Sequence, residues 1–343
     1  MITGIGSFPF TNVDEAIDVI LDSCPEIPFW PQLPKRASYE NMYLPFLEGV
    51  PCITIDQDEG TAFMDTGKTE GIEEFYENVG NSNLDAFCVS EKFAPGFYRF
   101  LERLKDTTVA PKFIKTQITG PFSMGLGLKD ENGKPVIYNY GYFDIIKKAL
   151  NLKAQWMISA IRTRFPHTKI IIFFDEPYMV SFGSAYVSIS KDEVIELFND
   201  VLGGIPAVRG IHCCGNTDWS VLFSADVDIV NYDAFNYLET VFYFEEDLRR
   251  FIGRGGKIAP GLIPSNSDDM RKIVPASHDE LCGKLSDLSY PALQEGMERF
   301  CELMKAKIGP EGLNDLIITP SCGLGSVTEE EARYAMGLLK TFR

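Results

Sequence analysis

The sequence predicts an α/β protein of the (β/α)₈ TIM-barrel class, with parallel strands and a single domain over residues 1–343. Short apolar runs alternate with segments of helical periodicity, and about eight such pairs match the number in a closed parallel barrel. The run from Lys169 to Phe174 is mostly β-branched or aromatic, which is typical of a strand buried on both faces. No Gly-x-Gly-x-x-Gly motif follows the first strand, so an open doubly wound sheet is the weaker alternative.

Each expected strand ends in turn or polar residues, and no repeat or low-complexity linker divides the chain. The helix expected at 141–165 is unusually long. The strands are expected at Ile2–Gly6, Cys52–Asp56, Lys112–Thr119, Lys169–Phe174, Gly210–His212, Ile229–Asn231, Lys257–Ala259 and Leu316–Thr319. The helices are expected near 12–22, 91–105, 141–165, 190–203, 216–223, 243–252, 290–307 and 327–341.

Composition indicates an ordinary globular protein, with 45% hydrophobic and 24% charged residues. No run of 18 or more apolar residues and no signal-type N-terminus is present, so we expect a cytoplasmic protein without a membrane partner. The eight cysteines follow no secreted disulfide framework, which fits a reducing compartment. A net charge of −17 argues against nucleic acid as a partner.

The segment from His212 to Asn216 carries the most specific chemical signal. Residues 208–211 form a short strand pattern, and residues i and i+2 of a strand point to the same side, so His212 and Cys214 would project together. The last expected strand delivers Cys322 to a similar position. One imidazole and two thiolates make three ligands of a catalytic zinc, which keeps its fourth position for water or substrate.

Each of these residues also has an ordinary structural interpretation. Free cysteine is among the most buried residue types, and a single histidine is usually a structural residue. Cys213 should point the opposite way from Cys214 and take no part in the site. Asp175 and Glu176 end the fourth expected strand, where they could serve simply as a helix cap and a first-turn acid before Pro177.

Several segments at these strand ends together resemble a known family. The segments are Ile5-Gly6-Ser7-Phe8-Pro9, Thr119-Gly120-Pro121, Asp175-Glu176-Pro177, His212-Cys213-Cys214, Pro260-Gly261 and Pro320-Ser321-Cys322-Gly323-Leu324. The chain is similar to the catalytic barrel of cobalamin-independent methionine synthase, from residue 4 to about residue 326. The amino-acid sequence of residues 212–217 is more similar to that of corrinoid-dependent methyltransferases, including the methylcobalamin:coenzyme M enzymes. Both families belong to the uroporphyrinogen decarboxylase superfamily.

The resemblance implies zinc on His212, Cys214 and Cys322. The family's fourth ligand is a glutamate, and the matching position here is Asp233, whose side chain is one methylene shorter and could equally be a turn or N-cap residue.

The resemblance also implies a substrate site beside the metal. In it, Asp175 binds the amino group of homocysteine, with Glu176 next to it. The backbone N–H groups of Ile5, Gly6 and Ser7 would bind the amino-acid carboxylate, although a tight turn after the first strand is a simpler interpretation of this segment.

Two departures from the family pattern stand out. The methionine synthase pattern has a histidine shortly after the Pro260-Gly261 pair, but none follows here, and His278 is too distant to match. The arginine-rich opening segment of the decarboxylases is replaced by residues 28–36, in which Lys35 and Arg36 are either a basic spot or solvated surface.

These observations predict a zinc-dependent methyltransferase that acts on a zinc-bound thiol such as homocysteine, and hence a role in methionine biosynthesis. The methyl donor would be methylcobalamin or a methyl-corrinoid protein, or else a methylated folate; the family's separate N-terminal barrel has no counterpart here, which favours the corrinoid. The alternatives are a porphyrinogen-type carboxy-lyase, which would need several arginines for substrate carboxylates, and a non-catalytic corrinoid- or zinc-binding accessory protein.

Overall fold

A computed structural model gives the fold of the chain, and it describes residues 1–108, 110–273 and 291–343. His278 lies outside the described residues, as does the first residue of the helix that the sequence predicts at 290–307.

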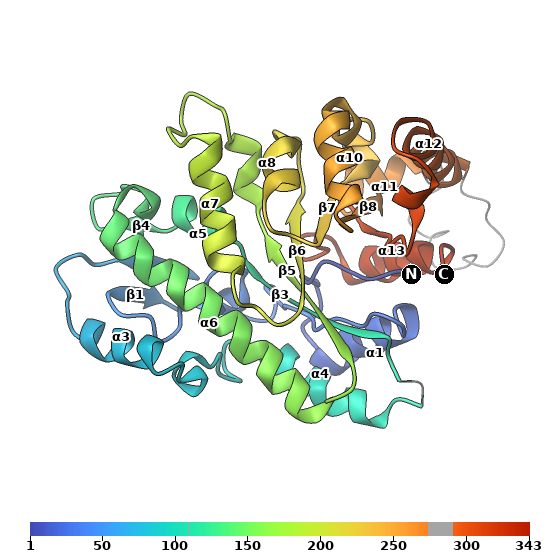
Figure 1. Cartoon of the computed structure of the whole chain (residues 1–343). Helices are drawn as coiled ribbons and strands as arrows, with labels where there is room; N and C mark the ends of the chain where they lie inside the picture. Colours follow the sequence, from blue (N-terminus) through green and yellow to red (C-terminus); the bar gives the residue numbers. More distant parts are fainter. Residues whose placement is uncertain (109, 274–290) are drawn as a thin grey trace.

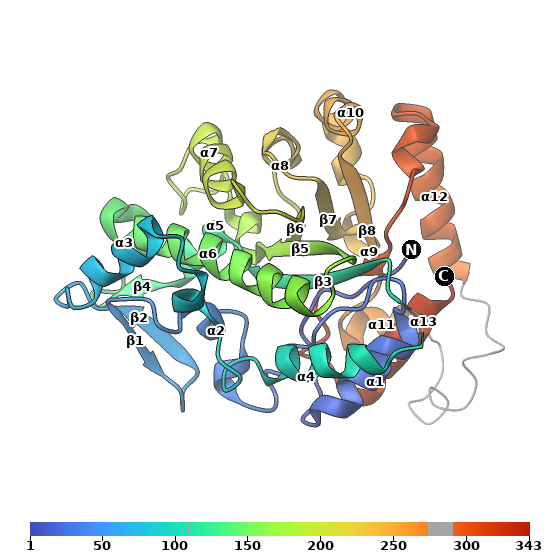
Figure 2. The ribbon, with the colours of Figure 1, turned by 60° about the horizontal axis from the view of Figure 1, so that its bottom comes forward.

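A curled parallel sheet forms the centre of the molecule (Figure 1). Within the described residues it has six strands in the order β3-β5-β6-β7-β8-β9. Helices α7 (Lys191–Leu202), α8 (Trp219–Ser224), α10 (Glu245–Gly253) and α12 (Pro291–Lys307) lie along its outer side (Figure 2). The architecture is therefore α/β and TIM-barrel-like, as predicted. The strands are β3 (Phe113–Thr119), β5 (Lys169–Asp175), β6 (Val208–Cys213), β7 (Ile229–Asp233), β8 (Lys257–Ile263) and β9 (Thr319–Pro320).

The predicted closure by eight strands is wrong. Between β9 and β3 the chain places residues 1–8 and 26–32, which make single parallel bridges instead of a ladder: Ile2 pairs with Ile318, Ser7 with Gln32, and Phe29 with Lys115. Proline lacks the N–H that a ladder needs, and residues 26–32 contain two prolines, so this segment cannot form a regular central strand.

The segment predicted as the second barrel strand belongs to a different sheet. Of residues 52–56, Ile53–Asp56 forms β1, which pairs antiparallel with β2 (Thr61–Met64) in a separate three-stranded sheet completed by β4 (Lys129–Asp130). Figures 1 and 2 place this sheet at the end of the molecule opposite α12. A strand of four residues in which isoleucine alternates with Thr54 and Asp56 does not indicate which sheet it joins, which is why the prediction failed here.

The eight predicted helices are present within a few residues of their expected bounds. Two of them begin with reciprocal capping boxes, Ser190 with Glu193 and Thr328 with Glu331, which satisfy the first backbone N–H groups. The helices are α1 (Val13–Ser23), α2 (Leu44–Leu47), α3 (Ile72–Gly80), α4 (Pro95–Arg103), α5 (Pro121–Gly127), α6 (Tyr140–Arg164), α7 (Lys191–Leu202), α8 (Trp219–Ser224), α9 (Ala234–Tyr237), α10 (Glu245–Gly253), α11 (Ser267–Ile273), α12 (Pro291–Lys307) and α13 (Glu329–Lys340).

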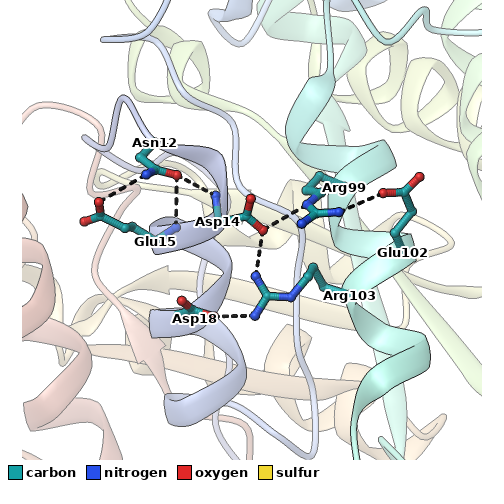
Figure 3. Close-up of polar contacts among 7 residues, drawn as sticks. All are labelled: Asn12, Asp14, Glu15, Asp18, Arg99, Glu102 and Arg103. Carbon is teal, nitrogen blue, oxygen red and sulfur yellow. Dashed lines mark hydrogen bonds and ion pairs between the residues drawn. The ribbon is translucent and has the colours of Figure 1, made fainter.

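Ion pairs on the surface join α1 to α4 (Figure 3). Asp14 accepts from Arg99 at 2.9 Å and from Arg103 at 2.7 Å, and Arg103 also pairs with Asp18. The hydrogen bond from Arg99 lowers the pKa of Asp14 most, and the hydrogen bond from Arg103 lowers it further. The side chain of Asn12 caps α1 by accepting from the N–H of Asp14. Because these groups are exposed, each pair contributes roughly 0.2–1 kcal/mol, and they orient the two helices more than they stabilise them.

Alternation along the strands divides the buried side chains into two layers. In β5, Ile170, Ile172 and Phe174 join the large core under the helices, whereas Ile171 and Phe173 belong to a smaller cluster inside the curled sheet. No helix in the described part of the chain combines the length and apolar character needed to cross a lipid bilayer.

Strand register brings the chemically active side chains to one edge of the sheet. Asp175 of β5 is the partner of His212 of β6, and His212 is the partner of Asn231 of β7. All of the paired strands are parallel, so their carboxyl ends meet at this edge, which is where barrel-type folds hold their ligands.

Candidate metal centre

His212, Cys214 and Cys322 lie together at the carboxyl edge of the sheet. One ligand atom from each residue falls within 4.8 Å of the others, and among the described residues this is the group of His, Cys, Asp and Glu side chains that could hold a metal ion. His212 and Cys214 come from the end of β6, two residues apart as the predicted alternation requires, and Cys322 follows β9. The predicted convergence of these three side chains is therefore present.

Cys213 is directed away from this group. It is fully buried in the large core under the helices, and its Sγ lies 3.4 Å from the carbonyl oxygen of Gly215. Burial raises the pKa of the Cys213 thiol, so this thiol is an inert core residue, as strand alternation indicates.

The imidazole of His212 has one ring nitrogen engaged and one free. Its Nδ1 lies 2.5 Å from Oδ1 of Asn231, whereas its buried Nε2 has no hydrogen-bond partner. A buried polar atom without a partner is costly, and a ligand normally accounts for it. The free Nε2 beside two thiols therefore fits a metal ion with nitrogen and sulfur ligands.

The two thiols of the group are hydrogen-bonded to each other. A hydrogen bond from Cys322 to Cys214, together with the neighbouring His212 ring, lowers the pKa of Cys214, and the same pairing raises the pKa of Cys322. One thiolate is thus already favoured at neutral pH. Because thiolates are the form that binds a metal, the electrostatics of the pair agree with zinc as the fitting ion.

Asp175 faces the same cavity from β5. Its carboxylate is almost completely buried, and Oδ1 has no hydrogen-bond partner. Burial raises the pKa of Asp175 to about 6, against the opposing effects of His212 and Lys115. Lys115 lies inside the sheet, where its ammonium group donates to the carbonyl of Ile5, and burial lowers its pKa to about 8. An orphan carboxylate oxygen of this kind is suited to a cationic or N–H group of a ligand.

Glu176 lies beside Asp175 but is engaged by the protein. Its two carboxylate oxygens accept from the backbone N–H groups of Phe122 at 2.9 Å and Ser123 at 2.7 Å, at the start of α5. Burial raises the pKa of Glu176 to about 8, although these hydrogen bonds oppose the shift. The family resemblance predicts that Glu176 contacts the substrate. In the structure, both of its carboxylate oxygens instead accept hydrogen bonds from the backbone of α5.

The Ile5-Gly6-Ser7 segment forms one wall of the site. Ile5 and Ser7 line the cavity, and the carbonyl of Ser7 accepts from the N–H of Leu324 at 2.8 Å. A Cβ added at Gly6 would lie 2.7 Å from the side chain of Gln117, so the glycine is required by packing inside the sheet.

Asp233 stands apart from the three clustered residues. Its side chain caps α9, with Oδ1 accepting from the N–H of Asn236 and Oδ2 from the Nδ2 of the same residue, both at 2.9 Å. Burial raises the pKa of Asp233 in spite of these hydrogen bonds. To reach a metal at the cluster, its carboxylate would have to give up at least one of the two contacts.

A cavity of about 300 Å³ opens over the cluster. Asn41 and Met42 form a wall of the cavity just before α2, which the sequence does not predict because they lie in a turn with no motif. The contact of Asn231 with His212 was not predicted either, because the only signal in the sequence is the position of Asn231 at a strand end. The lining residues are Ile5, Ser7, Pro34, Asn41, Met42, Asp175, Pro177, His212, Cys214, Cys322, Gly323, Gly325 and Ser326.

Comparison with known proteins identifies solved structures of similar fold. No protein-family model and no curated protein matches the sequence. A solved B12-independent methionine synthase from Shewanella sp. W3-18-1, in complex with selenomethionine, is similar at a TM-score of 0.56 and 16% identity, over 99% of this chain and 95% of that one. A methyltransferase from Methanosarcina mazei is similar at a TM-score of 0.54 and 11% identity, over 99% and 93%. At these identities the likeness establishes a shared fold.

Proposed function

We propose that this protein is a zinc-dependent methyltransferase that transfers a methyl group to a thiol bound at the centre formed by His212, Cys214 and Cys322. The observation that carries the proposal is the approach of their three ligand atoms to within 4.8 Å of one another beneath a cavity. Three nitrogen and sulfur ligands with space for a fourth are typical of a catalytic zinc, whereas structural zinc is closed by four protein ligands. Of the two similar solved structures named above, one is a B12-independent methionine synthase and the other is named a methyltransferase, which supports the proposal.

The acceptor is proposed to be a short amino thiol such as homocysteine. Bound zinc would supply the acidity that keeps a substrate thiol deprotonated at neutral pH. Asp175 would hold the amino group through its unpartnered Oδ1. Because Asp175 and His212 are partners on neighbouring strands, about 4.8 Å apart, the amine and sulfur of the acceptor must be only a few bonds from each other. Homocysteine meets this condition.

The cavity offers no basic side chain for a strongly anionic group of a ligand. None of the described residues that line it is lysine or arginine, so the sulfonate of coenzyme M would find no basic partner among them. The same observation gives no support to a porphyrinogen-type carboxy-lyase, whose substrate carries several carboxylates.

The methyl donor is proposed to be a methyl-corrinoid, free or protein-bound, with a methylated folate as the second choice. A corrin ring is far larger than a cavity of about 300 Å³, so it would present its methyl group at the opening without entering. A corrinoid protein docked over the carboxyl edge of the sheet would satisfy this geometry.

The test combines thiol binding with methyl transfer. Cobalt-substituted protein should change its absorption spectrum when homocysteine is added, because a new sulfur ligand enters the metal's surroundings. Zinc-loaded protein should then demethylate methylcobalamin with homocysteine as acceptor, and Asp175→Asn should raise the KM for homocysteine. A protein that binds zinc but transfers no methyl group from methylcobalamin or methylfolate to any thiol would overturn the proposal and favour an accessory role.

A further inference from the structure

Asn231 is the buried neighbour of His212 and takes no direct part in the proposed chemistry. It lies on β7, is fully buried, and stands in register between His212 of β6 and Ala259 of β8. Its side chain makes hydrogen bonds to three other strands of the sheet, β6, β8 and β9. These three contacts constrain the orientation of the side chain.

The two ends of the Asn231 amide can be told apart by their partners. One end lies 2.6 Å from the carbonyl oxygen of Ala259 and 2.8 Å from Oγ1 of Thr319. A carbonyl can only accept, so this end must be the NH₂ group. The hydroxyl of Thr319 donates to the carbonyl of Pro320 at 2.8 Å, which leaves its oxygen free to accept from Asn231. The other end, directed at His212, must be the carbonyl oxygen.

This orientation dictates the tautomer of His212. The Oδ1 of Asn231 can only accept, so Nδ1 of His212, 2.5 Å away, must carry the ring proton. In the neutral imidazole, Nε2 then has its lone pair exposed. Nε2 is also the ring nitrogen without a partner, on the side of Cys214 and Cys322.

We propose that Asn231 is the positioning residue of the metal centre: anchored by Ala259 and Thr319, it holds His212 in the Nδ1–H tautomer with Nε2 ready to bind metal. This inference rests on the proposed function only in one respect, namely that a bound metal is what the orientation of His212 serves. The arrangement itself follows from the hydrogen bonds. Residues that orient a histidine ligand in this way typically raise metal affinity by 10–100-fold.

An asparagine suits this position better than a carboxylate. A carboxylate could accept from His212, but it would direct a second acceptor at the carbonyl of Ala259 and has nothing to donate to Thr319. It would also add negative charge beside Asp175 and two thiols that a metal would deprotonate. The amide supplies one acceptor and two donors, which is the number of partners that the structure provides.

The tautomer can be measured without any metal. In metal-free protein with ¹⁵N-labelled histidine, long-range ¹H–¹⁵N spectra recorded at rising pH until the His212 ring is neutral distinguish a protonated Nδ1 from a protonated Nε2. The signals of His212 are assigned by their loss in His212→Gln. We expect the Nδ1–H form in the wild type and in Asn231→Asp, which keeps the acceptor, and a mixture in Asn231→Leu, which has similar volume and no acceptor.

Metal affinity provides the second readout. Asn231→Leu should bind Co²⁺ about 10–100-fold more weakly than the wild type. Ser265→Ala is the matched control, because it removes another buried hydrogen bond at the same edge, 2.8 Å long between Ser265 and Ser321, without contact with His212. It should lose stability while keeping the affinity.

The outcomes separate the inference from the proposed function. An Nε2–H tautomer in the wild type, or an unchanged Nδ1–H tautomer in Asn231→Leu, would overturn the role of Asn231 whatever the metal data show. If Asn231→Leu does not fold, the wild-type tautomer and Asn231→Asp still decide the matter. A wild type that holds the Nδ1–H form yet binds no metal would refute the zinc proposal and leave the positioning of His212 intact.

Discussion

Replacing Asp233 with alanine decides whether this residue caps a helix or binds the metal. The structure gives it two contacts, both at 2.9 Å and both to Asn236 at the start of α9. Loss of an N-cap carboxylate costs roughly 0.5–2 kcal/mol. The Nδ2 group of Asn236 keeps a second acceptor in Asp269 at 3.0 Å, so the backbone N–H is the group left unpaired. We therefore expect Asp233→Ala to lower the free energy of unfolding by about 1–2 kcal/mol.

Asn12→Ala is the matched control for this experiment. Asn12 caps α1 in the same manner, accepting from the N–H of Asp14 at 3.0 Å, and within the described residues its side-chain hydrogen bonds reach only Asp14 and Glu15, which are not part of the cluster. Denaturant unfolding should show losses of similar size in the two variants, and competition with a chelator should show metal affinity close to that of the wild type in both. A tenfold or larger drop in affinity confined to Asp233→Ala would refute the cap interpretation and make Asp233 the fourth ligand.

Three further predictions follow from the site and the core. Metal analysis should show zinc lost from Cys214→Ser and retained in Cys213→Ser, because only Cys214 belongs to the cluster. Lys153→Met should raise the free energy of unfolding at neutral pH by about 1–3 kcal/mol, since burial lowers the pKa of Lys153 to about 8. That gain should shrink as pH rises from 8 towards 10.5, where the folded wild type has lost the proton that its unfolded chain still binds; a gain independent of pH would refute the reasoning. Gly120→Ala should cost about 1–3 kcal/mol in denaturant unfolding, because its Cβ would lie 2.2 Å from the carboxylate of Glu176; wild-type stability would contradict this expectation.

The helices and central strands could be predicted because their signals are local. The run 169–174 forms β5 with one further residue, and the helix expected at 141–165 is α6, Tyr140–Arg164. The strands that were misplaced are those whose pairing depends on distant residues. Residues 26–32 take the place beside β3 through hydrogen bonds from Phe113 to Glu26 and from Lys115 to Pro28, which no pattern in their own sequence indicates.

The candidate site was predictable to the extent that it depends on strand alternation. His212 and Cys214 share a side because they are two residues apart, and Cys213 is directed into the core for the same reason. Partners across the sheet were not predictable from local sequence. That Glu176 would bind the start of α5, and that Asp233 would cap α9, depends on how the loops after each strand fold back.

The register of the sheet connects the proposed metal centre with the proposed acceptor site. Asp175, His212, Asn231 and Ala259 are successive partners across β5, β6, β7 and β8. Asp175 at one end of this row has an unpartnered oxygen, His212 next to it has an unpartnered nitrogen, and the residues beyond them fix the ring. Because all four are held by backbone ladders, the separation between the proposed amine and sulfur positions is set by strand spacing and not by flexible loops. A centre built in this way should discriminate between thiols by the distance from sulfur to amine, so lengthening homocysteine by one methylene should weaken binding more than removing its carboxylate's charge.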